Sequence, residues 1–151
     1  MTESEMLALT AELTSVKSQQ NIAAALALYH PDIELVSPGF GSCCQGRDEV
    51  EKSLKLFFQL FPDYRVTLTG YQFNGSVLLS SGEVSLTPNI PGWPCRSVCV
   101  PVQIEFRFRD KHIHKEVFGL DPKLVCDVAG VPVSLWKAAI SEFLSMHTVK
   151  E

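Results

Sequence analysis

The sequence has no long apolar run, no basic stripe and no paired-cysteine motif, and each absence excludes a class of protein. No stretch of the 151-residue chain approaches the roughly 20 consecutive apolar residues of a membrane-spanning helix. The thirteen Lys and Arg residues are scattered and the net charge is −4, which argues against binding to nucleic-acid phosphates. The start of the chain has neither the basic residues nor the apolar segment of a signal peptide. We therefore expect a cytoplasmic protein with no membrane or nucleic-acid partner.

The cysteines do not form a disulfide or metal motif. Their number, five, is odd, and Cys43 and Cys44 are adjacent, which rarely suits a mutual disulfide. Cys95 and Cys99 are four residues apart, unlike the Cys-x-x-Cys spacing of zinc and redox sites. The histidines are distant in sequence from these cysteines, so nothing completes a zinc site. We expect free thiols in a reduced compartment and no bound metal.

The first third of the chain predicts two helices. A hydrophobic content of 46% is enough for one core, and we expect a single domain over residues 1–151. Thr2 and Glu5 form a capping box, and apolar residues follow at helical spacing: Met6, Leu9, Leu13 and Val16. After a polar break at Lys17–Gln20, the segment Asn21–Tyr29 predicts a second helix that stops before Pro31.

A strand, a helix and then a series of strands are predicted next. Pro31–Ser37 alternates with period two and ends in a Pro-Gly turn, and a helix begins near Gly46 and ends at Pro62. Four strands follow, rich in Val, Thr, Phe, Tyr and Ile: Tyr64–Phe73, Ser76–Leu86, Val98–Arg109 and Ile113–Leu120. Turn signals at Asn74-Gly75 and Asp110-Lys111 make the sheet mostly antiparallel.

The order of these elements predicts an α+β fold. A proline-rich loop interrupts the strands at Pro88–Pro94, and a last helix is expected at about residues 132–146. Helices followed by consecutive strands imply a curved antiparallel sheet with helices covering one face. A strongly curved sheet under helices leaves room for a pocket.

Four segments together resemble the SnoaL-like polyketide cyclase family of the nuclear-transport-factor-two-like superfamily. In order, they are His30–Leu35, Gly46–Val50, Phe61–Val66 and Arg109–Ile113. The resemblance covers roughly residues 5–121 and leaves the last helix outside. It implies a conical, cystatin-like α+β barrel with helices on the concave face, a ligand inside the cone and a homodimer through the outer sheet face.

The resemblance also implies a catalytic residue. In the cyclases the final strand ends with an aspartate that acts as general acid and base, without metal or organic cofactor, and the matching residue here is Asp121. The chain departs from the family pattern at Lys115, where an acidic residue is usual, and at Val117, where tryptophan is usual. With these departures, the resemblance supports the fold better than it supports cyclisation.

Asp121 has two interpretations. It shares its strand phase with Ile113 and Val117, so it would face the interior unless a bulge resets the phase. A carboxylate among apolar side chains is suited to removing and returning a proton beside a carbonyl. The alternative is a capping residue before Pro122.

Pocket-lining candidates are aromatic or lie on the strands. Aromatic faces contact flat hydrophobic ligands over a large area, and ordinary core packing explains them as well. The candidate substrate-binding residues are Phe40, Phe58, Phe61, Glu83, Trp93 and Val117. For Glu83, which lies between Ser81 and Ser85, the alternative is an exposed strand face, which is the commoner explanation. Glu105 lies in a polar file that alternates with apolar residues, and we assign this file to the dimer surface.

Two functions are consistent with these features. The first is cofactor-independent acid/base catalysis on a small hydrophobic carbonyl compound, as in a cyclase or isomerase. The alternative is a non-catalytic small-ligand-binding or dimerisation module of the same fold, because this fold also occurs without chemistry.

Overall fold

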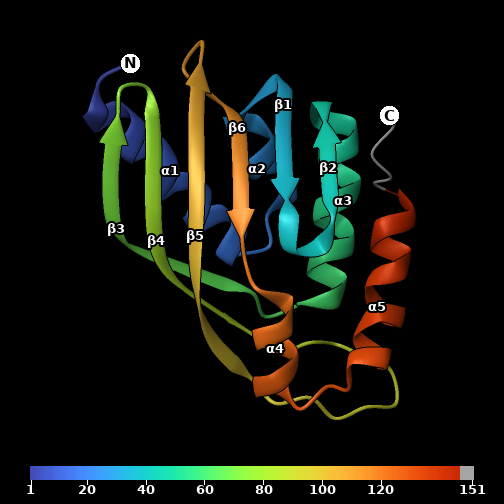
Figure 1. Ribbon diagram of the computed structural model, residues 1–151. Coiled ribbons are helices and arrows are strands. Elements are labelled where there is room, and N and C mark those ends of the chain that lie inside the picture. Colours follow the sequence, from blue (N-terminus) through green and yellow to red (C-terminus); the bar gives the residue numbers. More distant parts are fainter. Residues whose placement is uncertain (147–151) are drawn as a thin grey trace.

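A six-stranded sheet with helices on one face forms the body of the molecule (Figure 1). The structure, a computed structural model, describes the backbone of residues 1–146 and the side chains of residues 1–141. In chain order the elements are α1 (Glu3–Ser18), α2 (Ile22–Leu28), β1 (Tyr29–Ser37), the short 3-10 helix η1 (Pro38–Phe40), β2 (Ser42–Gln45), α3 (Gly46–Leu60), β3 (Arg65–Asn74), β4 (Val77–Leu86), β5 (Val98–Arg109), β6 (His112–Gly119), α4 (Pro122–Ala129) and α5 (Val133–Met146).

The sheet has the order β2-β1-β6-β5-β4-β3. All neighbouring strands are antiparallel except β1 and β6, which are parallel. The four strands predicted after Pro62 are confirmed within one or two residues, and both predicted turns join antiparallel neighbours. Asp110 and Lys111 both have positive φ, as expected in a two-residue turn whose twist matches that of the strands.

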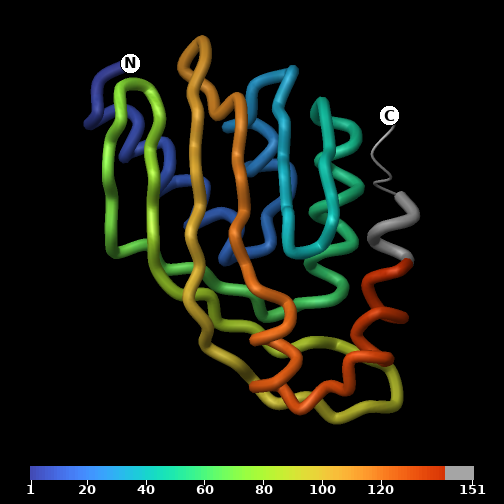
Figure 2. The backbone as a smooth tube through the Cα atoms, viewed as in Figure 1, coloured from blue at the N-terminus to red at the C-terminus, as the bar shows by residue number. Residues whose placement is uncertain are grey.

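The helices α1, α2 and α3 cover one face of the sheet. The Thr2 side chain accepts a hydrogen bond from the Glu5 backbone N–H at 3.1 Å, so the predicted helix start is confirmed. Helix α1 packs on β3 and α2, and α3 packs on β1 and β2. The backbone trace shows these helices behind the strands, with the N-terminus beside the β3–β4 hairpin (Figure 2).

Three features differ from the sequence prediction. The second helix ends at Leu28 and Tyr29 begins β1, because Tyr29 pairs with Ile113 in the sheet. The short strand β2 was not predicted, since four residues are too few to show a period. Helix α4 was also missed, although Asp121 and Pro122 carry an N-cap and N1 signal.

The strand β5 shows how the core is built. Its even-numbered residues from Val98 to Phe106 are buried under the helices, and its odd-numbered residues face outward.

The pairing between β3 and β4 shifts its register between Leu68 and Gly70. A Cβ on Gly82 would overlap the Thr67 carbonyl oxygen there, so only glycine allows the two strands to approach at this irregularity.

The last two helices lie at one end of the sheet, and α5 runs beside α3 (Figure 1). The Trp136 ring on α5 contacts Phe40 and Phe61, with ring centroids 5.9 Å away in both cases. Trp136 is buried by this chain alone. Within the described part of the chain, no helix combines the length and the apolar content needed to cross a membrane.

Candidate functional site

A small cavity lies between the sheet and the helices. Its volume is about 20 Å³, close to the space that a single water molecule needs. Most of its wall is apolar or aromatic, with a few polar groups. The lining residues are Lys17, Leu35, Ser37, Ser53, Leu54, Phe57, Phe58, Tyr64, Glu116 and Phe118.

The polar part of the cavity is a buried cluster around Glu116. The Lys17 ammonium group lies 3.1 Å from Oε1 and 3.0 Å from Oε2 of this carboxylate. The Tyr29 hydroxyl donates a hydrogen bond of 2.6 Å to Oε1. Glu116 is 1% exposed and Lys17 is 8% exposed, so solvent screens this ion pair very little. Three elements far apart in the sequence, α1, β1 and β6, therefore meet at one carboxylate.

Such a cluster is costly as a purely structural device. Removing two charges from water costs several kcal/mol per ion, and the attraction between them recovers this only with good geometry and further hydrogen bonds. Lys17 and Glu116 have that geometry, and the Tyr29 hydroxyl supplies the further bond. Charged groups that face an otherwise apolar cavity are typical of binding and catalytic sites.

Tyr64 adds a second hydroxyl group to the cavity. Its side chain is buried, and among the described residues no group forms a hydrogen bond with its hydroxyl. Burial, followed by the negative charge of Glu116, raises the pKa of Tyr64 well above its usual value. The hydroxyl is therefore a neutral hydrogen-bond donor available to a molecule in the cavity.

Phe57 separates the cavity from the end of the molecule covered by α5. Its ring lies 5.0 Å from both Phe61 and Tyr64 and 5.7 Å from Phe118, measured between ring centroids. Phe57 also contacts Phe40, which in turn contacts Trp136. Phe57 therefore fills the space between these rings and forms this side of the cavity wall.

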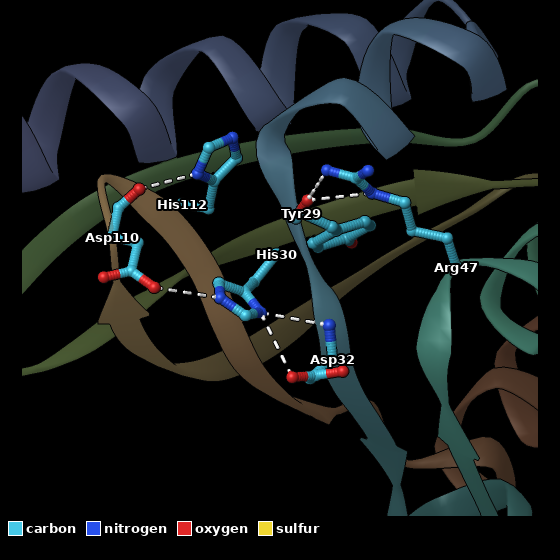
Figure 3. A network of polar contacts seen from close by, with 6 residues as sticks. All are labelled: Tyr29, His30, Asp32, Arg47, Asp110 and His112. Carbon is cyan, nitrogen blue, oxygen red and sulfur yellow. Dashed lines mark hydrogen bonds and ion pairs between the residues drawn. The ribbon is translucent and has the colours of Figure 1, made fainter.

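Local structure explains why these side chains converge. Lys17 follows Met6, Thr10 and Leu13 on the buried stripe of α1, and its position in the last turn also suits the helix dipole. Tyr29 is held through its backbone, because the Arg47 guanidinium donates to its carbonyl oxygen at 2.6 and 3.1 Å (Figure 3). The start of β1 is thereby tied to α3.

A second polar network lies at the same end of β1, on its other side. His30 Nε2 lies 3.2 Å from an Asp110 carboxylate oxygen, and its Nδ1 accepts a hydrogen bond from the Asp32 backbone N–H (Figure 3). His112 Nδ1 is 2.7 Å from the Asp110 carbonyl oxygen. Among residues 1–141, no three His, Cys, Asp or Glu side chains are arranged to hold a metal ion. This network joins β1 to the β5–β6 turn.

The expectation that Asp121 faces the interior is wrong. Arg107 pairs with Lys115 while Phe108 pairs with Ile113, so His114 is an extra residue in β6 and reverses the strand phase. Asp121 is exposed, and its carboxylate accepts hydrogen bonds from the Lys123 and Leu124 backbone N–H groups. It caps α4, as in the alternative interpretation. A catalytic role for Asp121 stays a prediction without support from the cavity.

Three of the four aromatic candidates are buried, and one of these three lines the cavity. Phe58 lies in the cavity wall, whereas Phe40 and Phe61 form the aromatic group beneath Trp136. Trp93 is partly exposed, and its indole N–H donates to the Gly130 carbonyl oxygen at 2.9 Å. This bond holds the proline-rich loop against the end of α4.

Glu83 and Val117 lie on the outer face of the sheet, and their predicted place in the pocket wall is wrong. Glu83 is exposed and accepts a hydrogen bond from the Cys99 thiol at 3.1 Å. Val117 has the opposite phase from Glu116 because of the extra residue in β6. Val117 instead borders a hollow on the outer face of the sheet.

Sequence reasoning missed the three residues at the centre of the site. Lys17 falls in the polar segment that ends α1, yet it lies four residues after Leu13 on the apolar stripe. Glu116 alternates with Phe118 and Leu120, a pattern that would have placed a carboxylate in the core. Tyr29 was assigned to the second helix instead of to the strand that positions its hydroxyl.

The SnoaL-like domain family matches residues 11–115, which is more than half of the chain. The protein therefore belongs to the SnoaL-like domain family. The match includes Lys17 and Tyr29 and ends one residue before Glu116. No curated protein sequence matches the chain.

Solved structures share the nuclear-transport-factor-two-like fold at low sequence identity. A hypothetical protein from Catenulispora acidiphila DSM 44928 with a ketosteroid isomerase-like fold, in complex with trimethylamine, is 19% identical, with a TM-score of 0.73 over 83% of this chain and 95% of the other. TerC, co-crystallised with polyporic acid, is 14% identical, with a TM-score of 0.71 over 83% and 98%. A protein from Jannaschia sp. CCS1, provisionally assigned as a SnoaL-like polyketide cyclase, is 13% identical, with a TM-score of 0.74 over 86% and 94%.

The ion pair can be tested with a double-mutant cycle. Glu116→Gln and Lys17→Met each leave a buried charge without its counter-charge, and we expect each to lower the free energy of unfolding by about 3–5 kcal/mol. The double variant should lose much less than the sum, because neither charge remains. The free energy of unfolding of the wild type, the two single variants and the double variant is measured by urea denaturation. The matched control is Glu51 and Lys55, an exposed pair 3.9 Å apart, whose coupling should stay below about 0.5 kcal/mol. Equal coupling energies in the two cycles would contradict the assignment of Lys17 and Glu116 as a buried ion pair.

The buried tyrosines predict a loss of stability in alkali. Burial, then the charge of Glu116, raises the pKa of Tyr29 and Tyr64 well above 10.0. Because the folded pKa exceeds the unfolded one, their stabilisation is complete below about pH 10 and is lost as the pH rises toward the folded pKa. Tyr64→Phe should reduce the decline of the free energy of unfolding with rising pH, measured by urea denaturation. Tyr71→Phe, at an exposed position, should leave it unchanged.

Proposed function

We propose that the protein catalyses proton transfer on a small carbonyl compound held in this cavity, without a cofactor, as in a cyclase or isomerase. The observation that carries the proposal is the carboxylate of Glu116, which is buried, charge-paired and part of the wall of a largely apolar cavity. A carboxylate beside a bound carbonyl compound can act as general base and then as general acid. Structural neighbours of this chain support a small-molecule site, since two of them were crystallised with small molecules, trimethylamine and polyporic acid.

The roles of the surrounding groups follow from their positions. Glu116 removes a proton from the carbon next to the carbonyl, and the negative charge that develops on the carbonyl oxygen accepts a hydrogen bond from the neutral Tyr64 hydroxyl. The proton returns at another carbon in an isomerisation. In a cyclisation, the carbanion attacks a second carbonyl carbon instead. Tyr29 and Lys17 hold the carboxylate in place.

A specific observation favours the non-catalytic alternative. Both oxygens of Glu116 are already engaged by Lys17 and Tyr29, and the cavity has room for little more than a water molecule. A protein that only binds a small molecule, or only dimerises, needs no free carboxylate. The two functions differ in one measurable property, which is exchange of protons on a bound carbonyl compound.

The catalytic proposal predicts proton exchange at carbon. Acetone, cyclopentanone and acetylacetone are incubated with the protein in D₂O, and deuterium incorporation beside the carbonyl is followed by NMR. We expect acceleration by the wild-type protein for at least one compound. Glu116→Gln should reduce it by roughly 100- to 10,000-fold, the usual contribution of a general base. Glu116→Asp retains the carboxylate and should retain part of the activity.

The matched control is Glu105→Gln. Glu105 lies on the outer sheet face in contact with Arg107, 3.1 Å away, so its loss should not alter exchange. Circular dichroism verifies that each variant is folded. Exchange at the buffer rate with every compound would refute catalysis of this type and leave the binding module as the better description.

We further propose that the protein forms a homodimer through the outer face of the sheet. The outward residues of β5 are mostly polar, and beside them lie two exposed apolar side chains, Tyr71 and Leu79. A hollow of about 510 Å³ lies over this face. It is lined by Gly70, Tyr71, Gln72, Leu79, Ser80, Ser81, Gln103, Ile104, Glu105, Val117 and Gly119. Apolar groups with a polar surround are typical of protein interfaces.

Size-exclusion chromatography with light scattering tests this interface. We expect a dimer for the wild-type protein and a shift to monomer for Leu79→Lys, because each copy would place a charge in the contact. Val128→Lys is the matched control, since Val128 is an exposed apolar residue on α4, away from the sheet face. A wild-type monomer, or equal dissociation of both variants, would contradict the proposal.

A further inference from the structure

Lys17 has an environment that a structural lysine does not need. We infer that its amino group forms an imine, a covalent C=N bond, with a small aldehyde or ketone in the cavity. The inference rests on the proposed function in one respect, since both require a carbonyl compound at this place. It goes further by naming a nucleophile and a covalent intermediate.

The first support is the position of the nitrogen atom. Among the lysines at positions 1–141, Lys17 is the one that is buried, and it lines the cavity. Its apolar neighbours Phe58 and Leu54 belong to the same wall. Lys55 is a useful contrast, because it is also paired with a glutamate but lies on the surface with its side chain 61% exposed. A lysine removed from water is the kind that enzymes use as an imine-forming nucleophile.

The second support is that a proton acceptor, the Glu116 carboxylate, already contacts the Lys17 amino group. An amine attacks a carbonyl carbon only after losing a proton, and both Glu116 oxygens lie within 3.1 Å of the Lys17 nitrogen. The proton can therefore move along an existing hydrogen bond. Tyr29 fixes Oε1, so the carboxylate does not rotate away from the amine during the transfer.

The reaction balances with the groups present. Glu116 takes a proton from the Lys17 ammonium, and the amine lone pair forms the C–N bond while the carbonyl π electrons move to oxygen. That oxygen receives one proton from nitrogen by way of Glu116. A second proton, transferred the same way, allows the C–O bond to break and water to leave. The nitrogen, which began with three hydrogens, keeps one in a positively charged iminium, and Glu116 ends as the carboxylate.

The cavity suits this step in polarity. The neutral Tyr64 hydroxyl can donate a hydrogen bond to the carbonyl oxygen before attack. The volume of about 20 Å³ is enough for the water that is released. The apolar wall keeps bulk water away from the imine. Because the cavity has room for little more than a water molecule, Phe57 must move aside to admit even a short aldehyde or ketone.

The iminium would also serve the proposed proton transfer. It carries the positive charge that Lys17 carried before, so the pairing with Glu116 is kept. A positively charged C=N group withdraws electrons from the neighbouring carbon and makes its protons easier to remove. Glu116, which is then a carboxylate again, lies next to that carbon.

Reductive trapping tests the imine. The protein is incubated with acetaldehyde and sodium cyanoborohydride, which reduces an iminium to a stable secondary amine, and labelled lysines are identified by peptide mass mapping. We expect Lys17 to gain one ethyl group roughly tenfold faster than Lys55, because an activated lysine outweighs the easier access of a surface one. Slower labelling of Lys17 than of Lys55 would overturn the inference.

Two conservative variants distinguish a loss of chemistry from a loss of folding. Lys17→Arg preserves the positive charge beside Glu116 but cannot form an imine, and Glu116→Asp preserves the carboxylate. We expect Lys17→Arg to lose ketone proton exchange, and Glu116→Asp to slow the labelling of Lys17. Wild-type exchange in Lys17→Arg would overturn the imine and leave Glu116 catalysis intact. Labelling of Lys17 without any exchange would overturn the proposed function and leave the imine intact.

Discussion

The buried contact between Lys17 and Glu116 is the interaction on which the interior of this protein depends. It joins the first helix to the sixth strand across 99 residues of sequence, and Tyr29 adds the first strand. Charges placed so deeply are stable only while each has its partner. The same pairing that carries the proposed chemistry thus also fixes the relative positions of α1, β1 and β6.

The surrounding structure serves to hold these groups and exclude water. Arg47 fastens the backbone of Tyr29 to α3, while Phe57 and its aromatic neighbours fill the space between the cavity and α5. Trp136 closes that end and lies outside the part of the chain that matches the SnoaL-like family. The family domain therefore supplies most of the cavity wall, and the added helices supply its cover.

Much of the fold could be predicted from the sequence, whereas the residues of the site were missed for two physical reasons. The strand Val98–Arg109 alternates without interruption, so its faces and bounds were predicted correctly. In β6 a single extra residue, His114, reverses the phase, so the residues before and after it indicate opposite faces. Counting from Ile113 therefore favoured Asp121, while the inward carboxylate is Glu116. Lys17 was hidden in a different way, because a charged residue at a helix end is usually solvated.

The parallel pairing of β1 with β6 has a consequence for how the chain folds. In the sheet order, β1 and β2 reach the other strands only through β6, which is the last strand to be made. On the ribosome, the early helices and first two strands must wait for residues beyond 112 before their edge is covered and Glu116 meets Lys17. Closure of the sheet is therefore a long-range step, and the interior is complete only once β6 has been synthesised.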